Sequence, residues 1–417
     1  MNQAGLRILI AFPHALHRTG GMEKACISLA NAMHRRGHAV RIGCVYGELA
    51  PLFYPLEEGV ELASFMESCG RAFPSPRLGR CLTPWEKVVR EMLRPFSRKR
   101  AAAWNERCEA RLIQAGIRRE LQQFRPDVIV SFQPNMTYYL RYAAGNVVPT
   151  ITSFRFNADH LMQKAAAPEI RSLNASDAIH VLLPSYAEAF PRYGVSTTVR
   201  YIPNAIPQCS EPAELDAPRA VHRIVDAARL NREQKRQHLL VEAFARLADE
   251  FPDWQVELWG DDAHYAGGYT GEILRFIRDR HLEERVRICG KTHDVESVYR
   301  QADIFCIPSS YEGFSNALGE AMSAGLPAVG YASCPGVNEV IQDGVTGLLA
   351  EDGVEALAAS LRRLMENQEL RVRMGRAARG AMEKFAPDRV WDEWESFLQE
   401  TARAHGTVSR QENGVGK

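Results

Sequence analysis

The sequence lacks several features that would assign it to whole classes of protein. Lys and Arg number 51 and so do Asp and Glu, which leaves a formal net charge of zero and no global sign of a charged partner. No window approaches the roughly 18 apolar residues of a membrane-spanning helix. The nine cysteines are scattered without a C-x-x-C pair, which is typical of a reduced, cytosolic protein.

Two motifs of nucleotide and sugar chemistry are also absent. There is no G-x-G-x-x-G dinucleotide fingerprint and no D-x-D, so neither a dinucleotide nor a metal bridging a diphosphate is expected. The apolar opening, residues 6–12, is too short for a signal peptide, and His14, His17 and Arg18 follow it. This run therefore predicts a buried first strand.

Short apolar runs rich in Val and Ile alternate with helical patterns along most of the chain, which predicts parallel strands joined by helices. We expect strands at 7–12, 40–45, 60–65, 128–132, 149–153, 179–183, 222–227, 255–259, 286–289, 304–307 and 327–331. We expect helices at 21–36, 235–250, 270–281, 315–324 and 387–403. The fold class is thus α/β, with two doubly wound Rossmann-like domains facing each other across a cleft.

The predicted domains are 1–205 and 206–385, because prolines between 203 and 218 break any regular element. A C-terminal helix, 386–403, is predicted to cross back to the first domain, and the polar tail 404–417 is predicted to be disordered.

The first strand leads into Gly20 and Gly21, and a helix begins near Glu23. Glycine allows close backbone approach and exposed helix N–H groups favour negative charge, so this turn is a candidate anion site. The alternative is a plain connecting turn.

Residues 71–119 hold 13 Lys or Arg against 4 Asp or Glu, a net charge of +9, with Trp85, Phe96 and Trp104 interleaved. A basic helical insertion with aromatics can rest on an anionic membrane or contact an anionic acceptor. The alternative is a solvated helical pair with a cationic outer face. Nucleic-acid binding is disfavoured because no recognition motif accompanies the charge.

In the second half, Arg229 and Lys235 follow a strand end, where open α/β sheets bind ligands, and both suit a diphosphate. After strand 304–307 come Glu312 and, eight residues later, Glu320. The backbone N–H groups of Gly313, Phe314 and Ser315 open the intervening helix and can hold a phosphate. Carboxylates in turn suit sugar and ribose hydroxyls.

These motifs together resemble the family 4 retaining glycosyltransferases of the GT-B fold, also described as glycosyl transferases group 1. The match rests on Gly20–Glu23, Ile202–Ile206, Arg229 with Lys235, and the E-x7-E element of Glu312 and Glu320. The segments 325–329, 339–344 and 347–349 extend it. The resemblance covers about 1–65 and 125–400, and 71–119 looks like an insertion.

The resemblance implies roles for single residues. Arg229, Lys235 and the backbone near Gly21 would contact the donor diphosphate, Glu320 the ribose and Glu312 the transferred sugar. Glu312, Arg229 and Lys235 are the catalytic candidates. The family often has a histidine after a first-domain strand, and this chain instead has Ser153, Arg155 and Asn157 in that region. The candidate acceptor-side residues are Glu23, Ser153, Arg155 and Asn157.

The implied function is retaining transfer of a hexose-type sugar from a nucleoside-diphosphate sugar to a saccharide or lipid-linked acceptor. It would need no cofactor or metal, and would serve polysaccharide or lipopolysaccharide synthesis at the cytoplasmic face of the membrane. The implied route is front-face, through an oxocarbenium-like transition state, with the cations stabilising the leaving diphosphate. The alternatives are a nucleotide-sugar 2-epimerase, and a catalytically silent nucleotide-sugar-binding subunit of an assembly complex.

Overall fold

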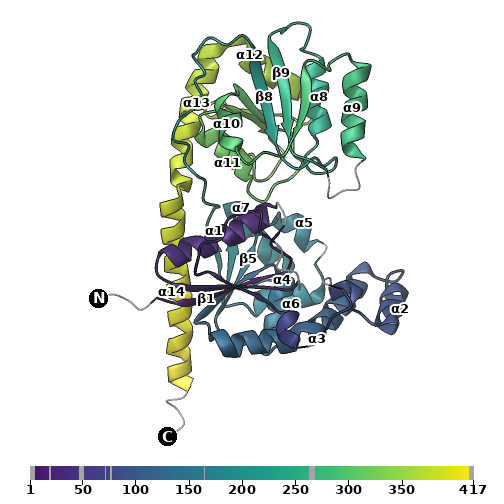
Figure 1. The fold of residues 1–417 in the computed structure, drawn as a ribbon, viewed down its shortest axis with the longest axis vertical. Helices are drawn as coiled ribbons and strands as arrows, with labels where there is room; N and C mark the ends of the chain where they lie inside the picture. The colour runs from purple at the N-terminus through teal and green to yellow at the C-terminus, as the bar shows by residue number, and fades with distance from the viewer. Residues whose placement is uncertain are drawn as a thin grey trace. The chain divides into compact units, whose positions relative to one another are not determined.

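The computed structural model describes residues 5–17, 20–46, 51–70, 72–75, 78–163, 165–262 and 268–412. The chain divides into two compact units, each with its own sheet (Figure 1). The first unit comprises Met1–Pro203 together with Val390–Lys417, and the second comprises Asn204–Arg389. The chain therefore leaves the first unit once and returns to it through its last helix.

The first unit is built on a seven-stranded parallel sheet in the order β3-β2-β1-β4-β5-β6-β7. Its strands are β1 (Arg7–Phe12), β2 (Ala39–Cys44), β3 (Glu61–Ser64), β4 (Val128–Phe132), β5 (Thr150–Phe154), β6 (Ala178–Val181) and β7 (Val199–Tyr201). All residues of β4, β5 and β6 are buried, as expected for parallel strands covered on both faces.

The longer connections of this unit are helical. Its α-helices are α1 (Gly21–Arg35), α2 (Pro84–Leu93), α3 (Arg98–Phe124), α4 (Pro134–Tyr138), α5 (Ala158–Met162), α6 (Ala167–Asn174), α7 (Pro184–Ala189) and, from Val390 onward, most of α14 (Pro387–Glu412). Short helical turns add η1 (Glu67–Cys69), η2 (Leu78–Arg80), the π-helical η3 (Tyr139–Ala143) and η4 (Phe190–Tyr193).

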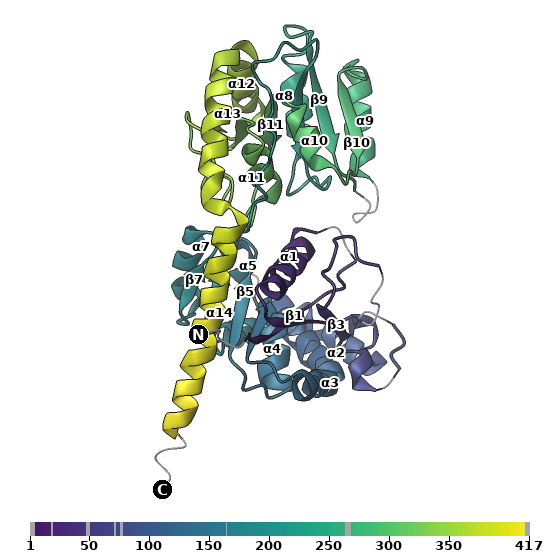
Figure 2. The same cartoon turned by 60° about the vertical axis from the view of Figure 1, so that its left-hand side comes forward.

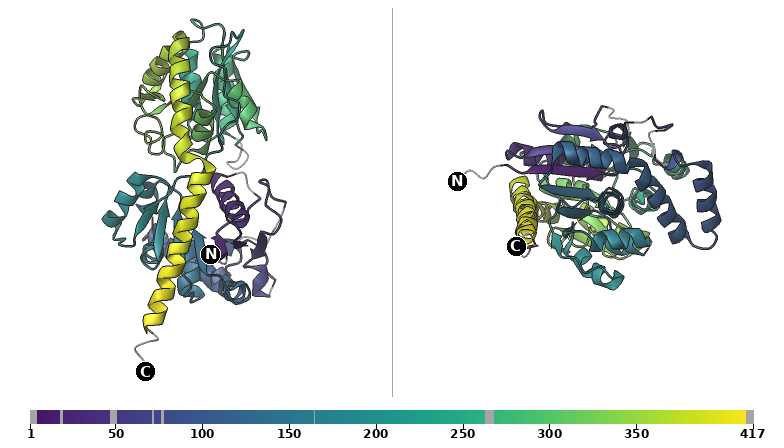
Figure 3. Two further views of the ribbon diagram at one scale, coloured as in Figure 1. Left: turned by 90° about the vertical axis from the view of Figure 1, so that its left-hand side faces the viewer. Right: turned by 90° about the horizontal axis from the view of Figure 1, so that it is seen from below.

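Helix α14 is held to the first unit by its apolar side. Trp394 and Leu398 are almost fully buried, and the Trp394 ring lies 4.4 Å from the His180 ring of β6. Glu395 binds His38 at 3.2 Å and Glu400 binds Arg200 at 2.6 Å. From Val390 onward, α14 lies along the first unit (Figure 3).

The second unit has a six-stranded parallel sheet in the order β10-β9-β8-β11-β12-β13. Its strands are β8 (His222–Ala227), β9 (Trp254–Trp259), β10 (Val286–Gly290), β11 (Ile304–Ile307), β12 (Ala328–Tyr331) and β13 (Gly347–Ala350). Its helices are α8 (Gln237–Ala245), α9 (Tyr269–Asp279), α10 (Val295–Arg300), α11 (Asn316–Ser323), α12 (Val354–Glu366), α13 (Gln368–Met382) and the short η5 (Glu383–Phe385). Figure 2 shows α12 and α13 packed beside this sheet.

The predicted α/β fold with two doubly wound sheets is confirmed, and every predicted strand is present within one or two residues. Two strands were not predicted, β7 and β13. Both are edge strands of three or four residues, too short for a clear apolar pattern.

The C-terminal end differs from the prediction. Helix α14 continues to Glu412, nine residues beyond the predicted helix end at 403. Ala402, Arg403 and Ala404 are good helix formers and no proline follows, so the helix can propagate beyond its packed part. Residues 413–417 of the predicted tail, and residues 71, 76 and 77 of the basic segment, lie outside the described ranges.

Among the described residues, no helix is both long enough and apolar enough to cross a bilayer. The basic segment instead forms a hairpin of α2 and α3 at the side of the first unit (Figure 1). Thr83 and Glu86 make a reciprocal cap at the start of α2, and the Trp104 indole donates to the Glu86 carbonyl at 3.1 Å. Trp104 thus packs between the helices, unlike Trp85 and Phe96, which are exposed.

Candidate functional site

The carboxyl ends of β8 and β11, neighbours at the centre of the second sheet, bring two predicted site loops together. Residues 228–236 follow β8, and residues 308–315 follow β11. The strand order reverses at this pair, since β9 lies outside β8 and β12 outside β11. Such a switch point is where open α/β sheets leave a crevice for ligands.

Lys235 and Glu312, predicted from separate motifs, form one ion pair across these loops. Lys235 Nζ lies 2.6 Å from Glu312 Oε1, and the Ser309 hydroxyl donates to the same oxygen at 2.6 Å. Glu312 is only 5% exposed. A carboxylate this buried is tolerated because a cation and a hydroxyl replace the water that it loses.

A third charged group lies below this pair. Asp226, in β8, is 2% exposed, and burial raises the pKa of its carboxyl to about 7, an effect that nearby Lys235 opposes and Glu312 reinforces. The positive charge of Lys235 therefore stabilises the ionised forms of two buried carboxyl groups, those of Glu312 and Asp226. At neutral pH only part of the Asp226 population is ionised, which limits the negative charge that one cation must balance.

Other polar contacts fix the two loops against each other. Arg236 has a positive φ of 53°, and its guanidinium donates to the carbonyls of Pro308 and Ser309 at 2.9 Å each. The Ser310 amide donates to the Gln234 carbonyl at 2.8 Å. The chain around Lys235 and Glu312 is thereby preorganised by backbone bonds.

The E-x7-E element continues into α11 as predicted. Ser315 is the N-cap, and its hydroxyl accepts from the Leu318 amide at 3.4 Å. Phe314 is buried and contacts Phe385 edge to face, which fixes the turn that contains Gly313. Glu320 follows on the same helix and is partly exposed. It lies four residues after the first residue of α11, and the start of a helix favours anions.

Arg229 lies directly after β8 and is partly exposed. Gly260, at the end of β9, has a φ of 142°, and a Cβ there would overlap the Ala228 carbonyl. This close approach of two backbones holds the segment that begins with Ala228. Arg229 is thus presented from a fixed strand end of the same sheet edge as Lys235.

In the first unit, the glycine turn after β1 is described from Gly20 onward. Gly20 caps α1, which begins at Gly21. A Cβ on Gly20 would overlap the carboxylate of Glu23, whereas a Cβ on Gly21 would meet nothing within 4 Å. Any larger residue at Gly20 would displace the Glu23 carboxylate, whereas Gly21 leaves open space beside a helix N-terminus.

Two of the predicted acceptor-side residues, Ser153 and Arg155, belong to a hydrogen-bonded chain in the first unit. The Arg155 guanidinium donates to the Ser153 hydroxyl at 3.0 Å, and Ser153 lies 2.9 Å from His180 Nδ1. His180 Nε2 donates to the Ile202 carbonyl at 2.8 Å. Burial, followed by the charge of Arg155, holds the His180 pKa well below its usual range. The ring is therefore neutral, and its Nδ1 accepts from Ser153.

Ser153 is fully buried and thus contacts the protein interior, while Arg155 is partly exposed beside it. Burial lowers the pKa of Arg155 to about 10, and its guanidinium lies 4.8 Å from the Phe132 ring centre. Asn157 is also partly exposed and starts the turn into α5, where its carbonyl accepts from the Leu161 amide. Of this group, only Arg155 and Asn157 retain exposed surface.

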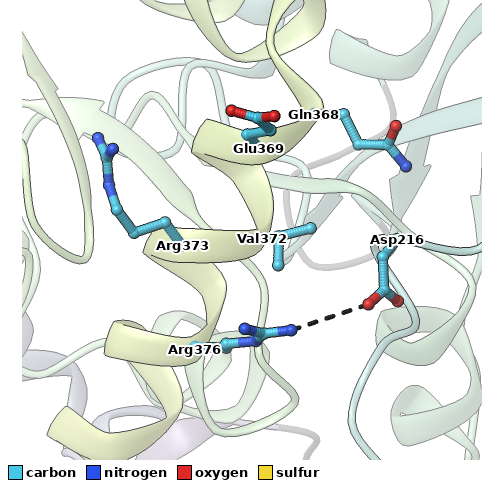
Figure 4. A pocket seen from close by; sticks show the side chains of 6 residues that line it. All are labelled: Asp216, Gln368, Glu369, Val372, Arg373 and Arg376. Carbon is cyan, nitrogen blue, oxygen red and sulfur yellow. Dashed lines mark ion pairs between the residues drawn. The ribbon is translucent and has the colours of Figure 1, made fainter.

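A separate hollow of about 530 Å³ lies along α13 in the second unit and is lined by six residues (Figure 4). Arg376 points to Asp216 across it, at 3.8 Å. Gly375 on α13 packs against the carbonyl of Gly325, which precedes β12. The hollow therefore lies at the amino edge of the sheet, away from Lys235 and Glu312.

Sequence reasoning missed Asp226, Ser309 and Arg236. An Asp inside the apolar run of β8 was a usable signal, because an ionisable residue in a buried strand needs a partner. Nothing in the sequence shows that Ser309 donates to Glu312, since that contact depends on how residues 308–312 turn.

We predict that Asp226→Asn changes the pH dependence of stability. The folded-state pKa of about 7 exceeds the unfolded value of about 3.9, so the stability contribution is complete below about pH 4 and is lost as the pH rises towards 7. The variant, which cannot ionise, should gain stability relative to wild type as the pH rises from about 4 to about 7, by at most about 1.4 kcal/mol per pH unit, and the difference should level off above pH 7. Urea unfolding at several pH values measures this, with exposed Asp249→Asn as control. Parallel curves for wild type and Asp226→Asn would contradict it.

Comparison with known families agrees with the two-unit fold. Residues 19–208 match the model of Glycosyltransferase Family 4, and residues 213–381 match that of Glycosyl transferases group 1. The Anabaena protein HepE, solved with UDP and glucose, superposes with a TM-score of 0.70 at 18% identity, over 94% of this chain and 99% of its own.

Two sequence relatives cover almost the whole chain. An exopolysaccharide phosphotransferase of Streptomyces coelicolor is 26% identical over 91% of this chain but only 39% of its own length. A phosphatidyl-myo-inositol mannosyltransferase of Mycobacterium leprae is 24% identical over 97% of both chains. The alignments with the first relatives span about two fifths of their length. From both family models and the fold, the chain belongs to the GT-B glycosyltransferases of family 4 and group 1.

Proposed function

We propose that this chain transfers a hexose-type sugar, with retention, from a nucleoside-diphosphate sugar to a saccharide or lipid-linked acceptor in cell-surface polysaccharide or glycolipid synthesis. The observation that carries the proposal is the Lys235–Glu312 pair at the sheet switch point, beside the start of α11. The relatives point the same way: HepE was solved with UDP and glucose, and the Mycobacterium leprae relative is named a mannosyltransferase.

In this proposal the donor diphosphate binds the cations of the second unit. The Lys235 ammonium has three N–H donors, and one of them bonds Glu312, so the others can reach phosphate oxygens. Arg229 adds a planar fork, and the N–H groups of Gly313–Ser315 add helix-end donors. Together they stabilise the charge that develops on the leaving nucleoside diphosphate.

Glu312 acts by positioning and electrostatics in this mechanism. Its Oε1 accepts from both Ser309 and Lys235, and these two bonds hold the carboxylate in place. Front-face transfer, in which the acceptor loses its proton to the departing phosphate, requires no protein nucleophile. Glu320 binds the ribose hydroxyls.

Two alternatives remain open to experiment. A nucleotide-sugar 2-epimerase would consume donor without an acceptor and release an isomer. A silent binding subunit would bind the donor without turnover. The continuous E-x7-E element, with Arg229 and Lys235, favours the transferase over the epimerase.

A second part of the proposal is reversible contact with the cytoplasmic face of an anionic membrane through α2. Trp85, Val88 and Met92 are spaced by three and four residues on this helix, and Phe96 follows. They are 47–84% exposed, which is unusual for a large apolar stripe. Exposed Arg94, Lys99 and Arg100 lie beside it in the sequence. Apolar and cationic groups together are what an anionic lipid surface binds.

We predict that Arg229→Ala and Glu320→Ala each lower kcat/KM for the nucleotide sugar about tenfold or more, equivalent to about 1.4 kcal/mol of transition-state binding. Both side chains are partly exposed, so their loss should leave the fold intact. Lys235 and Glu312 are less suitable, because removing either leaves the other buried and unpaired. Exposed Arg278→Ala on α9 is the matched control. Wild-type kinetics in a folded Arg229→Ala or Glu320→Ala would remove that residue from the site.

We also predict that transfer needs no divalent metal, because Arg229, Lys235 and the α11 N-terminus would supply the positive charge. Turnover measured in excess EDTA should equal turnover with added Mg²⁺ or Mn²⁺. Activity abolished by EDTA and restored by either ion would overturn this.

The membrane proposal predicts sedimentation with anionic liposomes at low salt and release at high salt, because screening acts over about 8 Å at physiological ionic strength. Phe96→Ser and the double variant Lys99→Gln, Arg100→Gln should both reduce binding, by up to about 1 kcal/mol per cation. Exposed Glu393→Gln on α14 serves as control. Equal absence from the pellet at both salt concentrations would contradict the proposal.

A further inference from the structure

An open cavity lies against the α2–α3 hairpin, and none of the predicted site residues lines it. Its volume is about 690 Å³, enough for a monosaccharide with a charged group. It lies wholly within the first unit, between the two hairpin helices and α4. Its lining residues are Arg90, Arg94, Arg98, Ala101, Ala102, Asn105, Glu106, Glu109, Asn135 and Tyr139.

The cavity lies at the functional edge of the first sheet. Asn135 belongs to α4, which follows the carboxyl end of β4. The opposite end of α3 lies at the amino edge, where the Arg7 guanidinium donates to the Phe124 carbonyl. Strand order reverses between β1 and β4, so β4 adjoins the switch point at which such sheets bind ligands. The glycine turn of Gly20 and Gly21 follows β1, the other strand of that point.

Three guanidinium groups face the cavity, and the carboxylates that form ion pairs with them are fewer than the guanidinium groups. Arg90 and Arg94 share one carboxylate, that of Glu91, while Arg98 opens α3. Two cations against one anion, plus a third cation at a helix N-terminus, leave an excess of positive charge. Guanidinium forks bind phosphate oxygens in pairs.

The acidic residues of the lining offset only part of that charge. Burial, with the neighbouring charges of Glu169 and Glu109, raises the pKa of Glu106 to about 8, so its carboxyl is mostly protonated at neutral pH. Burial also raises the pKa of Glu109, which accepts from Tyr139 and Asn105. Glu106 Oε2 is buried and has no hydrogen-bond partner among the described residues. Such an orphaned oxygen needs a polar partner.

We infer that this cavity binds the phosphate-bearing part of the acceptor, with the arginines on the phosphate and Glu106 and Asn135 on adjacent hydroxyls. That the ligand is an acceptor rests on the proposed transferase function, but binding of the phosphate to this cavity does not require a donor. The small side chains of Ala101 and Ala102 leave the floor of the cavity open to a ring. A phosphorylated saccharide and a lipid phosphate share this chemistry.

Direct titration tests the site without any turnover. Isothermal calorimetry with glucose 1-phosphate, geranyl phosphate and uncharged glucose should detect binding of at least one phosphate and none of glucose. Tighter binding of glucose 1-phosphate identifies a phosphorylated saccharide, and tighter binding of geranyl phosphate identifies a lipid-linked acceptor. Failure of both phosphates to bind would overturn the inference.

Variants separate the cavity from general surface charge. Arg98→Gln, alone and with Arg94→Gln, should weaken phosphate binding about fivefold or more, since each removes a charge-assisted contact. Arg107→Gln is the matched control, because it removes the same charge from an exposed position of α3 outside the cavity lining. Loss of a cation from the first turn does not weaken the helix, so Arg98→Gln should still fold. Equal weakening by Arg107→Gln, or none by the double variant, would overturn the assignment.

The two proposals fail in different ways. Phosphate binding that depends on Arg98, together with no turnover of any nucleotide sugar, would uphold the cavity and refute the transferase. Transfer that proceeds with unchanged acceptor KM in the Arg94, Arg98 double variant would refute the cavity as the acceptor site and uphold the transferase.

Discussion

Lys235 is the cation on which the polar centre of the second unit depends. Its ammonium bonds Glu312 at 2.6 Å, and its charge also favours ionisation of Asp226 beneath. Burying two carboxyl groups a few residues from the sheet core is costly unless a cation shares the site. One flexible side chain thus couples the loop after β8 to the loop after β11, and any phosphate bound there would compete with Glu312 for the same charge.

The segment that joins the units is anchored on both sides. In the first unit, His180 donates to the Ile202 carbonyl, and Trp394 packs on the same imidazole. In the second unit, the Asn204 amide donates to the Asn316 side chain at 2.8 Å, at the start of α11. Only Pro203 lies between Ile202, which bonds the His180 ring of the Ser153–Arg155 network, and Asn204, which bonds the first residue of α11.

The sequence predicted the sheets well because buried parallel strands have an apolar pattern that does not depend on distant contacts. It predicted the pairing partners less well. Lys235 and Glu312 were both expected at the site, but their mutual bond follows from the order of β8 and β11 in the sheet. Ser153 was expected to face an acceptor and is buried instead, because His180 on β6 takes its hydroxyl. Contacts between side chains of neighbouring strands cannot be predicted from local sequence patterns. The cavity at the α2–α3 hairpin could not be predicted for the same reason.

Because α14 is the last element of the chain and belongs mostly to the first unit, the two units are completed at different times during translation. Residues 204–389 form the second unit as one unbroken stretch, so that unit can fold as soon as the stretch has been synthesised. The first unit begins earlier but lacks Trp394 and Leu398, both buried in it, until nearly the whole chain has emerged. Domains usually fold in the order of synthesis. Here the first unit begins earlier and is completed last. Its apolar surface beside His180, which Trp394 covers in the folded protein, therefore lacks the last helix until the second unit has been translated.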